Sequence, residues 1–407
     1  MKNFTLIQWV VILILALLTA LEPLSIDLYL PGFIQIADAF NTPINNVQIS
    51  LSTFLGGFAI GQLIWGPLAD KFGRKKPILM SLAIFIVASV ACIYAQTVEQ
   101  LWVIRFVQAI GGCGGVVIAR AVVTDYFDKS DTLKIFSLLA LIMGIAPIIA
   151  PIAGNGILRL FSWEALFAVL VILGIIMFLF TMFALPETHK PRLVPENSKT
   201  NVFRDYISIL RVKKFFIYSL IAGIANGALM IYVANGPFLI MEYGKLSNNA
   251  FSVIFAINAF GLMLASYLTS YLQKSIPVNK LVKLSIIFMF FISAVLLVLM
   301  WMNANIYLIL FALFFYIFPI GILFPTTTEL AITPFVNNSG TASALFGSIQ
   351  LLVAFICSIV SNALSNGSVE TVGISFFLCC LFAFTVIFVR IDERKKLSTV
   401  NKPQVNG

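Results

Sequence analysis

Apolar segments long enough to cross a lipid bilayer recur along the whole chain. A helix that rises about 1.5 Å per residue needs about 20 apolar residues to cross roughly 30 Å of hydrocarbon. Because lipid offers backbone groups no hydrogen-bond partner, each segment is predicted to be a helix. We therefore expect an all-α integral membrane fold with 12 transmembrane helices, at roughly 7–31, 47–69, 77–96, 100–124, 133–157, 163–185, 215–239, 249–272, 281–302, 305–328, 340–364 and 371–391.

The composition supports this fold class. Of the 407 residues, 60% are hydrophobic and 11% are charged, whereas soluble chains carry about 25% charged residues. The surface is therefore expected to face lipid. The five cysteines all fall inside predicted spans and are interpreted as packing residues, without metal-ligand spacing or a disulfide framework. They are Cys92, Cys113, Cys357, Cys379 and Cys380.

The basic residues indicate how the chain is oriented. With a cytoplasmic N-terminus, all but four of the 26 Lys and Arg lie in cytoplasmic segments, as the positive-inside rule predicts. The exceptions are Arg105 and Arg120 inside the fourth span, and Arg159 and Lys245 in outer loops. We expect both termini in the cytoplasm, anionic lipid as the partner of the basic loops, and a multi-pass protein of the bacterial inner membrane. Basic residues scattered over separate loops do not favour nucleic-acid binding.

A polar segment divides the chain in two. Residues 186–214 carry seven basic residues and predict a cytoplasmic linker between six-helix halves at 1–185 and 215–391, with a cytoplasmic tail at 392–407. Two such halves are typical of transporters built from repeats, which bind substrate between the halves near mid-membrane.

The loop between spans two and three carries the first motif. The run from Gly66 to Lys76 places Asp70 at a helix end, a tight turn at Gly73, and Arg74 near the inner headgroups. An acid there can interact with the positive N-terminal end of another helix. The run resembles the loop signature of the major facilitator superfamily, G-x-L-a-D-x-x-G-R-K. The alternative is a basic hairpin without further role, which would need neither Asp70 nor the glycines.

The fourth span contains two arginines. Buried charges in a membrane helix are costly, so Arg105 and Arg120 are both candidates for function. The run from Arg105 to Gly112 resembles the fourth-span motif of the superfamily, where the arginine at the position of Arg105 is tied to proton coupling. For Arg120, an ion pair with Asp70 or Asp125 is the favoured interpretation. Gly111 and Gly115 are predicted to allow close helix packing.

The fifth span contains Gly144, Pro147, Pro151 and Gly154. Each proline removes a backbone hydrogen bond and bends the helix. The run resembles the span-five motif of the antiporters of the superfamily rather than its symporters, although Ala stands where that motif often has Gly. The alternative is a kinked packing helix.

The first span carries Glu22 and Asp27, and Asp27 is followed by Leu-Tyr-Leu-Pro. This pattern resembles the bicyclomycin/chloramphenicol-resistance (Bcr/CflA) branch of the twelve-span drug:proton antiporters. The resemblance covers the first half and the layout of the second. The loop at 265–274, between spans eight and nine, lacks the Asp and Gly-Arg pattern of its counterpart.

The only histidine, His189, lies in the linker, so a carboxyl must carry the proton. Desolvation in an apolar cavity favours the protonated carboxyl, while a nearby arginine favours the ionised one. We expect Asp27 as the first carrier and Glu22 as the second, with Arg105 as the partner. The two acids lie about 140° apart on an ideal helix, so facing one cavity requires a distortion that Pro23 can supply.

The last six spans have amides and aromatics near mid-membrane and no acid. Amides and aromatics suit a neutral or mixed-polarity ligand; alternatively, most of them bond across helices. The candidates for the substrate cavity are Asn226, Asn235, Asn258 and Gln350, with Tyr29 from the first half.

These residues predict a monomeric secondary transporter that exports small amphipathic molecules by proton antiport and alternating access. Drugs, metabolites and siderophores are the candidate substrates. The alternative is proton-coupled uptake of a small nutrient by the same fold. A membrane enzyme or sensor would need a catalytic cluster, metal-ligand spacing or a soluble domain. The sequence shows none of these, so no catalytic residue, metal or cofactor is expected.

Overall fold

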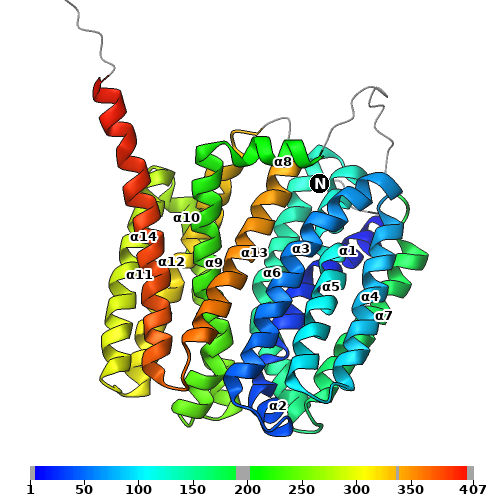
Figure 1. Cartoon of the computed structure of the whole chain (residues 1–407). Coiled ribbons are helices and arrows are strands. Elements are labelled where there is room, and N and C mark those ends of the chain that lie inside the picture. The colour runs from blue at the N-terminus through cyan, green and yellow to red at the C-terminus, as the bar shows by residue number, and fades with distance from the viewer. Residues whose placement is uncertain (1–4, 189–201, 336–338, 401–407) are drawn as a thin grey trace, which may run out of the picture.

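The computed structural model describes residues 5–188, 202–335 and 339–400, and within these ranges it is helical without strands (Figure 1). The helices are α1 (Leu6–Asp27), η1 (Leu30–Gly32), α2 (Phe33–Ala39), α3 (Ile44–Phe72), α4 (Lys75–Ile93), α5 (Val98–Tyr126), α6 (Lys129–Leu158), α7 (Glu164–Ala184), α8 (Val202–Leu210), α9 (Lys213–Pro237), η2 (Phe238–Tyr243), α10 (Asn248–Leu272), α11 (Val278–Trp301), α12 (Ile306–Ile332), α13 (Ser339–Leu364) and α14 (Val369–Val400).

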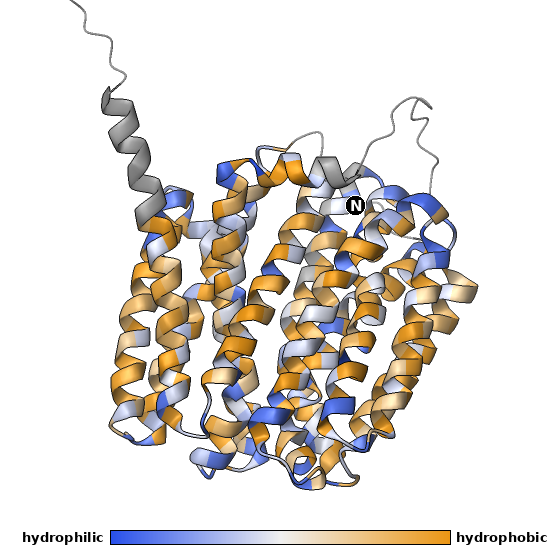
Figure 2. Ribbon diagram, in the orientation of Figure 1, coloured by the Kyte–Doolittle hydropathy of each residue, from blue (hydrophilic) through white to orange (hydrophobic). Residues whose placement is uncertain are grey.

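Twelve spans within the described residues are long and apolar enough to cross a membrane. Their sides are largely apolar, and polar residues gather at their two ends (Figure 2). The predicted all-α membrane fold is thus confirmed. The first span differs most from its prediction, because it runs over Leu6–Ala39 and includes α1, η1 and α2.

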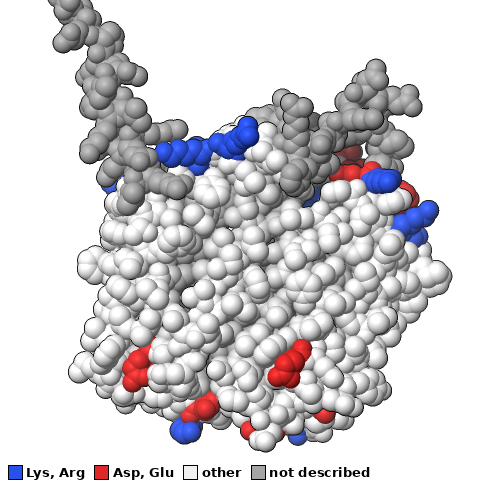
Figure 3. Space-filling model, in the orientation of Figure 1, with Lys and Arg blue, Asp and Glu red and all other residues white. Residues whose placement is uncertain are grey.

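The two ends of the bundle differ. The start of α1, α8 and the distal end of α14 lie at one end of the bundle, here named the α8 end, and α2 lies at the opposite α2 end (Figure 1). On the face shown in Figure 3, Lys and Arg gather mainly at the α8 end. Residues 189–201 of the predicted linker, including His189, and residues 401–407 of the predicted tail lie outside the described residues.

The first six spans (α1 to α7) meet the last six (α9 to α14) mainly through two helix pairs, α3 with α13 and α6 with α10. Smaller contacts join η1 to α9 and α10, and α3 to α9. One further hydrogen bond near the midpoint joins Ser348 Oγ to the carbonyl of Ala59, at 3.1 Å. The side-chain bonds at the α2 end are Ser52–Ser358 (2.6 Å), Asn362 to Ser52 (3.1 Å), Asn155 to Asn249 (2.6 Å), Arg159 to Asn249, and Ser252 to the Pro151 carbonyl (3.2 Å).

Close packing of α5 depends on its glycines, as the sequence predicts. A Cβ at Gly111 would collide with the backbone of Phe85 on α4. A Cβ at Gly115 would lie 2.9 Å from the side chain of Leu18 on α1. These two positions therefore let α5 approach both neighbours closely, which brings Arg105 next to α1.

Candidate functional site

The first span is broken in its middle, next to Asp27. Pro31 has no N–H to donate to the carbonyl of Asp27, and its ring disfavours a continuous helix there. α1 therefore ends at Asp27, and the 3-10 turn η1 follows at Leu30–Gly32. Asp27 is only 4% exposed, and its carboxyl makes no hydrogen bond or ion pair with the described residues. The charge of Glu22 acts on it, as expected if both acids face one region.

Arg105 is fully buried and holds the end of α1. Its Nη2 donates to the carbonyl of Ser25 at 2.9 Å, and its Nη1 donates to Gln108 Oε1 at 2.6 Å. The guanidinium also lies 4.3 Å from the ring centre of Phe54 and 4.8 Å from that of Tyr29. Within the described chain no carboxylate lies within ion-pair distance of Arg105. The expected Arg105–Asp27 pair is therefore absent from this structure, because the backbone of α1 takes the guanidinium instead.

Tyr29 lies beside Arg105 among the first six spans. Its hydroxyl bonds to Ser50 Oγ at 2.8 Å, and its ring packs on Phe33 and Phe167. Gln108 continues the network by donating to Ser89 Oγ on α4 at 2.7 Å. Tyr29 therefore packs against the guanidinium of Arg105 and is itself held in place by Ser50, Phe33 and Phe167.

Arg74, not Arg120, binds the two acids near the α8 end. Arg74 Nη1 donates to Asp70 Oδ1 and its Nε donates to Asp125 Oδ2, both at 2.7 Å. Burial lowers the pKa of Arg74, but these bonds raise it by more, so the pKa stands above its ordinary value. The favoured ion pair of Arg120 with Asp70 or Asp125 is therefore wrong. Arg120 is exposed, and its charge acts on Glu22.

The loop after α3 turns at Gly73, as predicted, with a φ of +85° that favours glycine. A Cβ there would lie 2.7 Å from Oε2 of Glu187. The Glu187 carboxylate accepts the backbone N–H groups of Arg74 (2.8 Å) and Lys75 (3.2 Å). An acid at the N-terminus of α4 is favourable, so Glu187 ties the end of the sixth span to this loop. Gly66 faces open space, because a Cβ added there would have no heavy atom within 4 Å.

The motif of the fifth span lies in α6, with Pro147 and Pro151 inside the helix. A Cβ at Gly154 would collide with the carbonyl oxygen of Leu28, directly after Asp27. A Cβ at Gly144 would lie 3.3 Å from Sδ of Met263 on α10. The motif therefore packs α6 against the break in α1 on one side and against α10 on the other.

The amides of the last six spans lie in different surroundings. Asn258 Nδ2 donates to the hydroxyl of Tyr232 at 2.9 Å, and Asn235 Nδ2 donates to the carbonyl of Ile231 at 2.9 Å. Asn226 is buried on α9 and Gln350 is half-buried on α13. The charge of Asp27 acts on the Tyr232 hydroxyl, so Tyr232 lies near the break.

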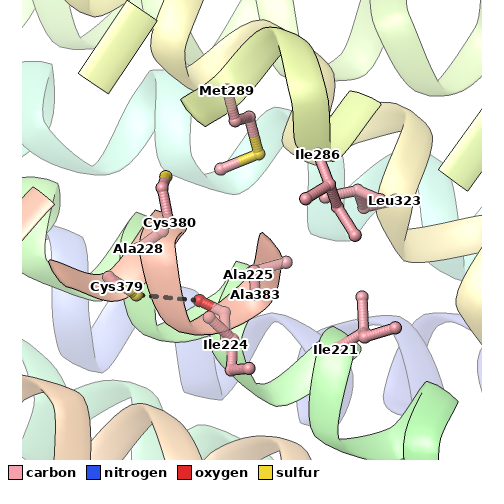
Figure 4. Close-up of a pocket in the computed structure, with 10 residues that line it drawn as sticks. All are labelled: Ile221, Ile224, Ala225, Ala228, Ile286, Met289, Leu323, Cys379, Cys380 and Ala383. Carbon is pink, nitrogen blue, oxygen red and sulfur yellow. Dashed lines mark hydrogen bonds between the residues drawn. The ribbon is translucent and has the colours of Figure 1, made fainter. Parts of the chain in front are cut away.

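A small cavity of about 10 Å³ lies elsewhere, inside the last six spans (Figure 4). Such a volume is about the minimum for one water molecule. It is lined by α9, α11, α12 and α14 and contains none of the predicted substrate residues. Its lining is apolar apart from Cys379, Cys380 and Met289, and Cys379 Sγ donates to the carbonyl of Ile224 at 3.4 Å. We interpret the cavity as a packing defect.

Sequence reasoning assigns no role to Gln108, Glu187, Tyr232 or Asn249. Gln108 stands in the quoted motif three residues after Arg105, and that helical spacing is a usable signal. Glu187 follows a span directly, but its partners lie more than 100 residues away. Tyr232 and Asn249 carry no local signal, because their bonds depend on how separate spans are arranged.

The family description that matches residues 15–358 is the Major Facilitator Superfamily. The chain belongs to the major facilitator superfamily. It is therefore a multi-pass membrane transporter of small molecules rather than an enzyme. The resemblance predicted from the motifs is confirmed at this level.

Named relatives cover nearly the whole chain. The uncharacterized MFS-type transporter YdgK of Bacillus subtilis is 33% identical over 384 residues, which is 94% of this chain and 95% of YdgK. The multidrug resistance protein MdtL of a Shewanella strain is 30% identical and covers 92% of each chain. The bicyclomycin resistance protein homolog of Haemophilus influenzae is 27% identical, with coverage of 86% and 87%.

Solved structures agree in fold. A D-xylose-proton symporter aligns with a TM-score of 0.75 at 15% identity, over 93% of this chain and 97% of the symporter. A bacterial homolog of the lysosomal transporter Spinster, in an inward-facing conformation, aligns with a TM-score of 0.70 at 16% identity, over 98% and 100%. At these identities the likeness describes the fold alone.

Proposed function

We propose that this chain exports small amphipathic molecules by proton antiport, with Asp27 as the proton carrier. The observation that carries the proposal is a buried carboxyl without a bonded partner among the described residues, placed at a break in the first span. Broken helices at membrane depth mark the sites of many secondary transporters. A buried carboxyl without a partner is costly when ionised, so Asp27 is suited to gain and lose a proton as its surroundings change.

The arrangement of the spans suggests how access alternates. We take the α8 end as cytoplasmic, on the strength of its basic residues. The halves at 1–185 and 215–391 bond to each other at the α2 end and near the midpoint, which corresponds to an inward-facing state. Substrate would enter from the cytoplasm or inner leaflet, past Glu22 and Arg120. The halves would then rock about the break, and a proton on Asp27 would drive the return.

The names of the relatives favour export. MdtL is a multidrug resistance protein, and the Haemophilus protein is a bicyclomycin resistance homolog. The bacterial relatives also support an inner-membrane location, and we propose a monomer with anionic lipid at its basic end.

Asn226 and Gln350 are the proposed substrate contacts, since neither side chain forms a hydrogen bond with another described residue. The likeness to a sugar symporter is one of fold and does not favour uptake.

Transport by reconstituted protein tests the proposal. Vesicles holding the full chain are given a pH gradient and a panel of labelled amphipathic compounds. We expect the wild type to accumulate at least one compound against its gradient, and Asp27→Asn to lose pH-driven accumulation while it still exchanges substrate. Asp38→Asn, an exposed acid at the end of α2, is the matched control and should behave as the wild type.

Accumulation by Asp27→Asn at the wild-type level would show that another group couples the proton. Uptake makes a different prediction in cells. Loss of the protein would then abolish growth on one nutrient, whereas loss of an exporter sensitises cells to at least one compound.

A further inference from the structure

Two side chains of the last six spans form a preorganised hydrogen-bond donor. Asn258 Nδ2 on α10 donates to the hydroxyl oxygen of Tyr232 on α9 at 2.9 Å. The hydroxyl proton of Tyr232 has no acceptor among the described residues. The ring of Tyr232 is stacked on Phe255, with centroids 5.5 Å apart and planes at 18°. Tyr232 is 2% exposed and Asn258 is 3% exposed, so packing holds both groups in place.

The donor is built on one face of α10. Phe251, Phe255 and Asn258 are spaced as i, i+4 and i+7, which places them on the same side of the helix. Phe251 packs on Phe255 at 5.7 Å between ring centroids. This face fixes the ring of Tyr232 by stacking on Phe255 and its hydroxyl oxygen by the Asn258 amide. The hydroxyl hydrogen of Tyr232 is therefore available to another acceptor.

The broken segment of the first span packs on the same two helices. η1, which begins three residues after Asp27, contacts both α9 and α10. Asp27 is the last residue of α1, directly before this segment, and its charge acts on the Tyr232 hydroxyl. Its carboxyl is buried and makes no hydrogen bond or ion pair with the described residues. A carboxyl without a donor and a hydroxyl without an acceptor therefore lie on opposite sides of one interface.

We propose that Tyr232, oriented by Asn258, donates a hydrogen bond to Asp27 when its carboxyl is ionised. This inference rests on the proposed proton-carrying role of Asp27. Hydrogen bonds to an ionised acceptor are shorter and stronger than those between neutral groups. The bond therefore stabilises the proton-free form of the site and weakens when the proton binds. A substrate with its own donor group would compete with Tyr232 for the carboxylate.

Other charged groups near Asp27 do not replace this donor. Glu22 on α1 acts on Asp27 with the same sign of charge, and Arg105 on α5 is bonded to Ser25 and Gln108. The Tyr29 hydroxyl is hydrogen-bonded to Ser50 Oγ, as donor or acceptor. The remaining described charges on the helices that pack on α1 lie toward helix ends. They are Glu99, Arg120 and Asp125 on α5, Asp131 and Lys134 on α6, Arg159 after α6, and Glu164 on α7.

Infrared titration of the purified full chain tests the inference without a substrate. The band of a protonated carboxyl is followed as pH rises, and Asp27→Asn identifies the part that belongs to Asp27. We expect the titration midpoint of Asp27 in Tyr232→Phe to lie at a proton concentration about tenfold lower than in the wild type. The ionised carboxyl loses one hydrogen bond in this variant, so Asp27 holds its proton more tightly. Asn258→Leu, which removes only the orienting amide, should shift the midpoint in the same direction by less.

Tyr267→Phe is the matched control, since Tyr267 is exposed and bonds to Tyr271, and it should leave the midpoint unchanged. A titrating Asp27 band whose midpoint is the same in wild type, Tyr232→Phe and Asn258→Leu would overturn this inference alone. If Asp27→Asn removes no part of the protonated-carboxyl band, the proposed proton-carrying role of Asp27 is overturned instead. An equal shift in Tyr267→Phe would show an indirect effect and also overturn the inference.

Discussion

At the scale of single residues, Arg105 shows how a buried charge can be kept without a counter-ion among the described residues. The carbonyl of Ser25 lies in the last turn of α1, where the helix dipole presents partial negative charge. The aromatic faces of Phe54 and Tyr29 add cation–π attraction. The guanidinium therefore bonds to two partners and lies over two aromatic rings, which a carboxylate partner would disturb. This arrangement leaves Asp27 outside any ion pair with Arg105.

Arg105→Lys tests whether this geometry matters beyond charge. An ammonium cannot reach Ser25 and Gln108 in the same planar arrangement and stacks less well on rings. We expect a loss of about 1–3 kcal/mol of stability, the cost of leaving one buried polar partner unpaired. Thermal unfolding in detergent measures this, with the exposed Arg211→Lys as the control. Wild-type stability in Arg105→Lys would mean that charge alone suffices.

The choice of partners is harder to predict than the residues themselves. The sequence identifies Asp70, Asp125 and Arg120 as candidates, but Arg74 and not Arg120 binds the two acids. Asp70 and Arg74 lie four residues apart, across the end of α3, so that pair has a local signal. The bond of Arg74 to Asp125 depends on how α5 packs on α3, and spacing along the chain carries no information on it.

At the scale of elements, the span lengths are predictable from the sequence and the break in the first span is not. Hydrocarbon thickness dictates about 20 apolar residues per span, and the observed helices match the predicted segments within a few residues at most ends. The sequence predicts that the first span ends at Pro31. The chain instead continues through η1 into α2, because the apolar residues after Pro31 are buried among the other helices. Pro23, the predicted source of distortion, lies inside α1.

Gly154 is the element-scale contact that keeps α6 against this break. Gly154→Ala would force a Cβ into the carbonyl oxygen of Leu28 and push α6 away. We expect lower stability and loss of most pH-driven transport in vesicles. Gly156→Ala is a matched control two residues along the same helix, with nothing within 4 Å of its Cβ. It should be neutral or stabilise by up to about 1 kcal/mol, since Ala favours helix over Gly. If Gly154→Ala and Gly156→Ala have the same stability and transport, Gly154 does not hold α6 against the break.

At the scale of the whole molecule, the structure is fastened at the α2 end. Oδ1 of Asn249 accepts hydrogen bonds from both Asn155 and Arg159, which links α10 to α6. Ser52 links α3 to α13 through Ser358 and Asn362. Asp70, near the α8 end, is 73% exposed in its side chain, and Gly66 faces open space. In an alternating-access cycle, the bonds at the α2 end must break before that end opens.

Asn249→Ala therefore should favour opening at the α2 end. It removes the acceptor of two hydrogen bonds, each contributing about 0.5–1.5 kcal/mol, so the ratio of closed to open states should fall by a factor of about 5 to 100. Spin labels at the exposed positions Leu160 and Lys245, in a chain whose five cysteines are replaced, report the separation of α6 and α10. We expect a larger share of long distances in Asn249→Ala than in Asn248→Ala, the neighbouring control. Identical distance distributions would mean that helix packing, and not these bonds, holds the α2 end closed.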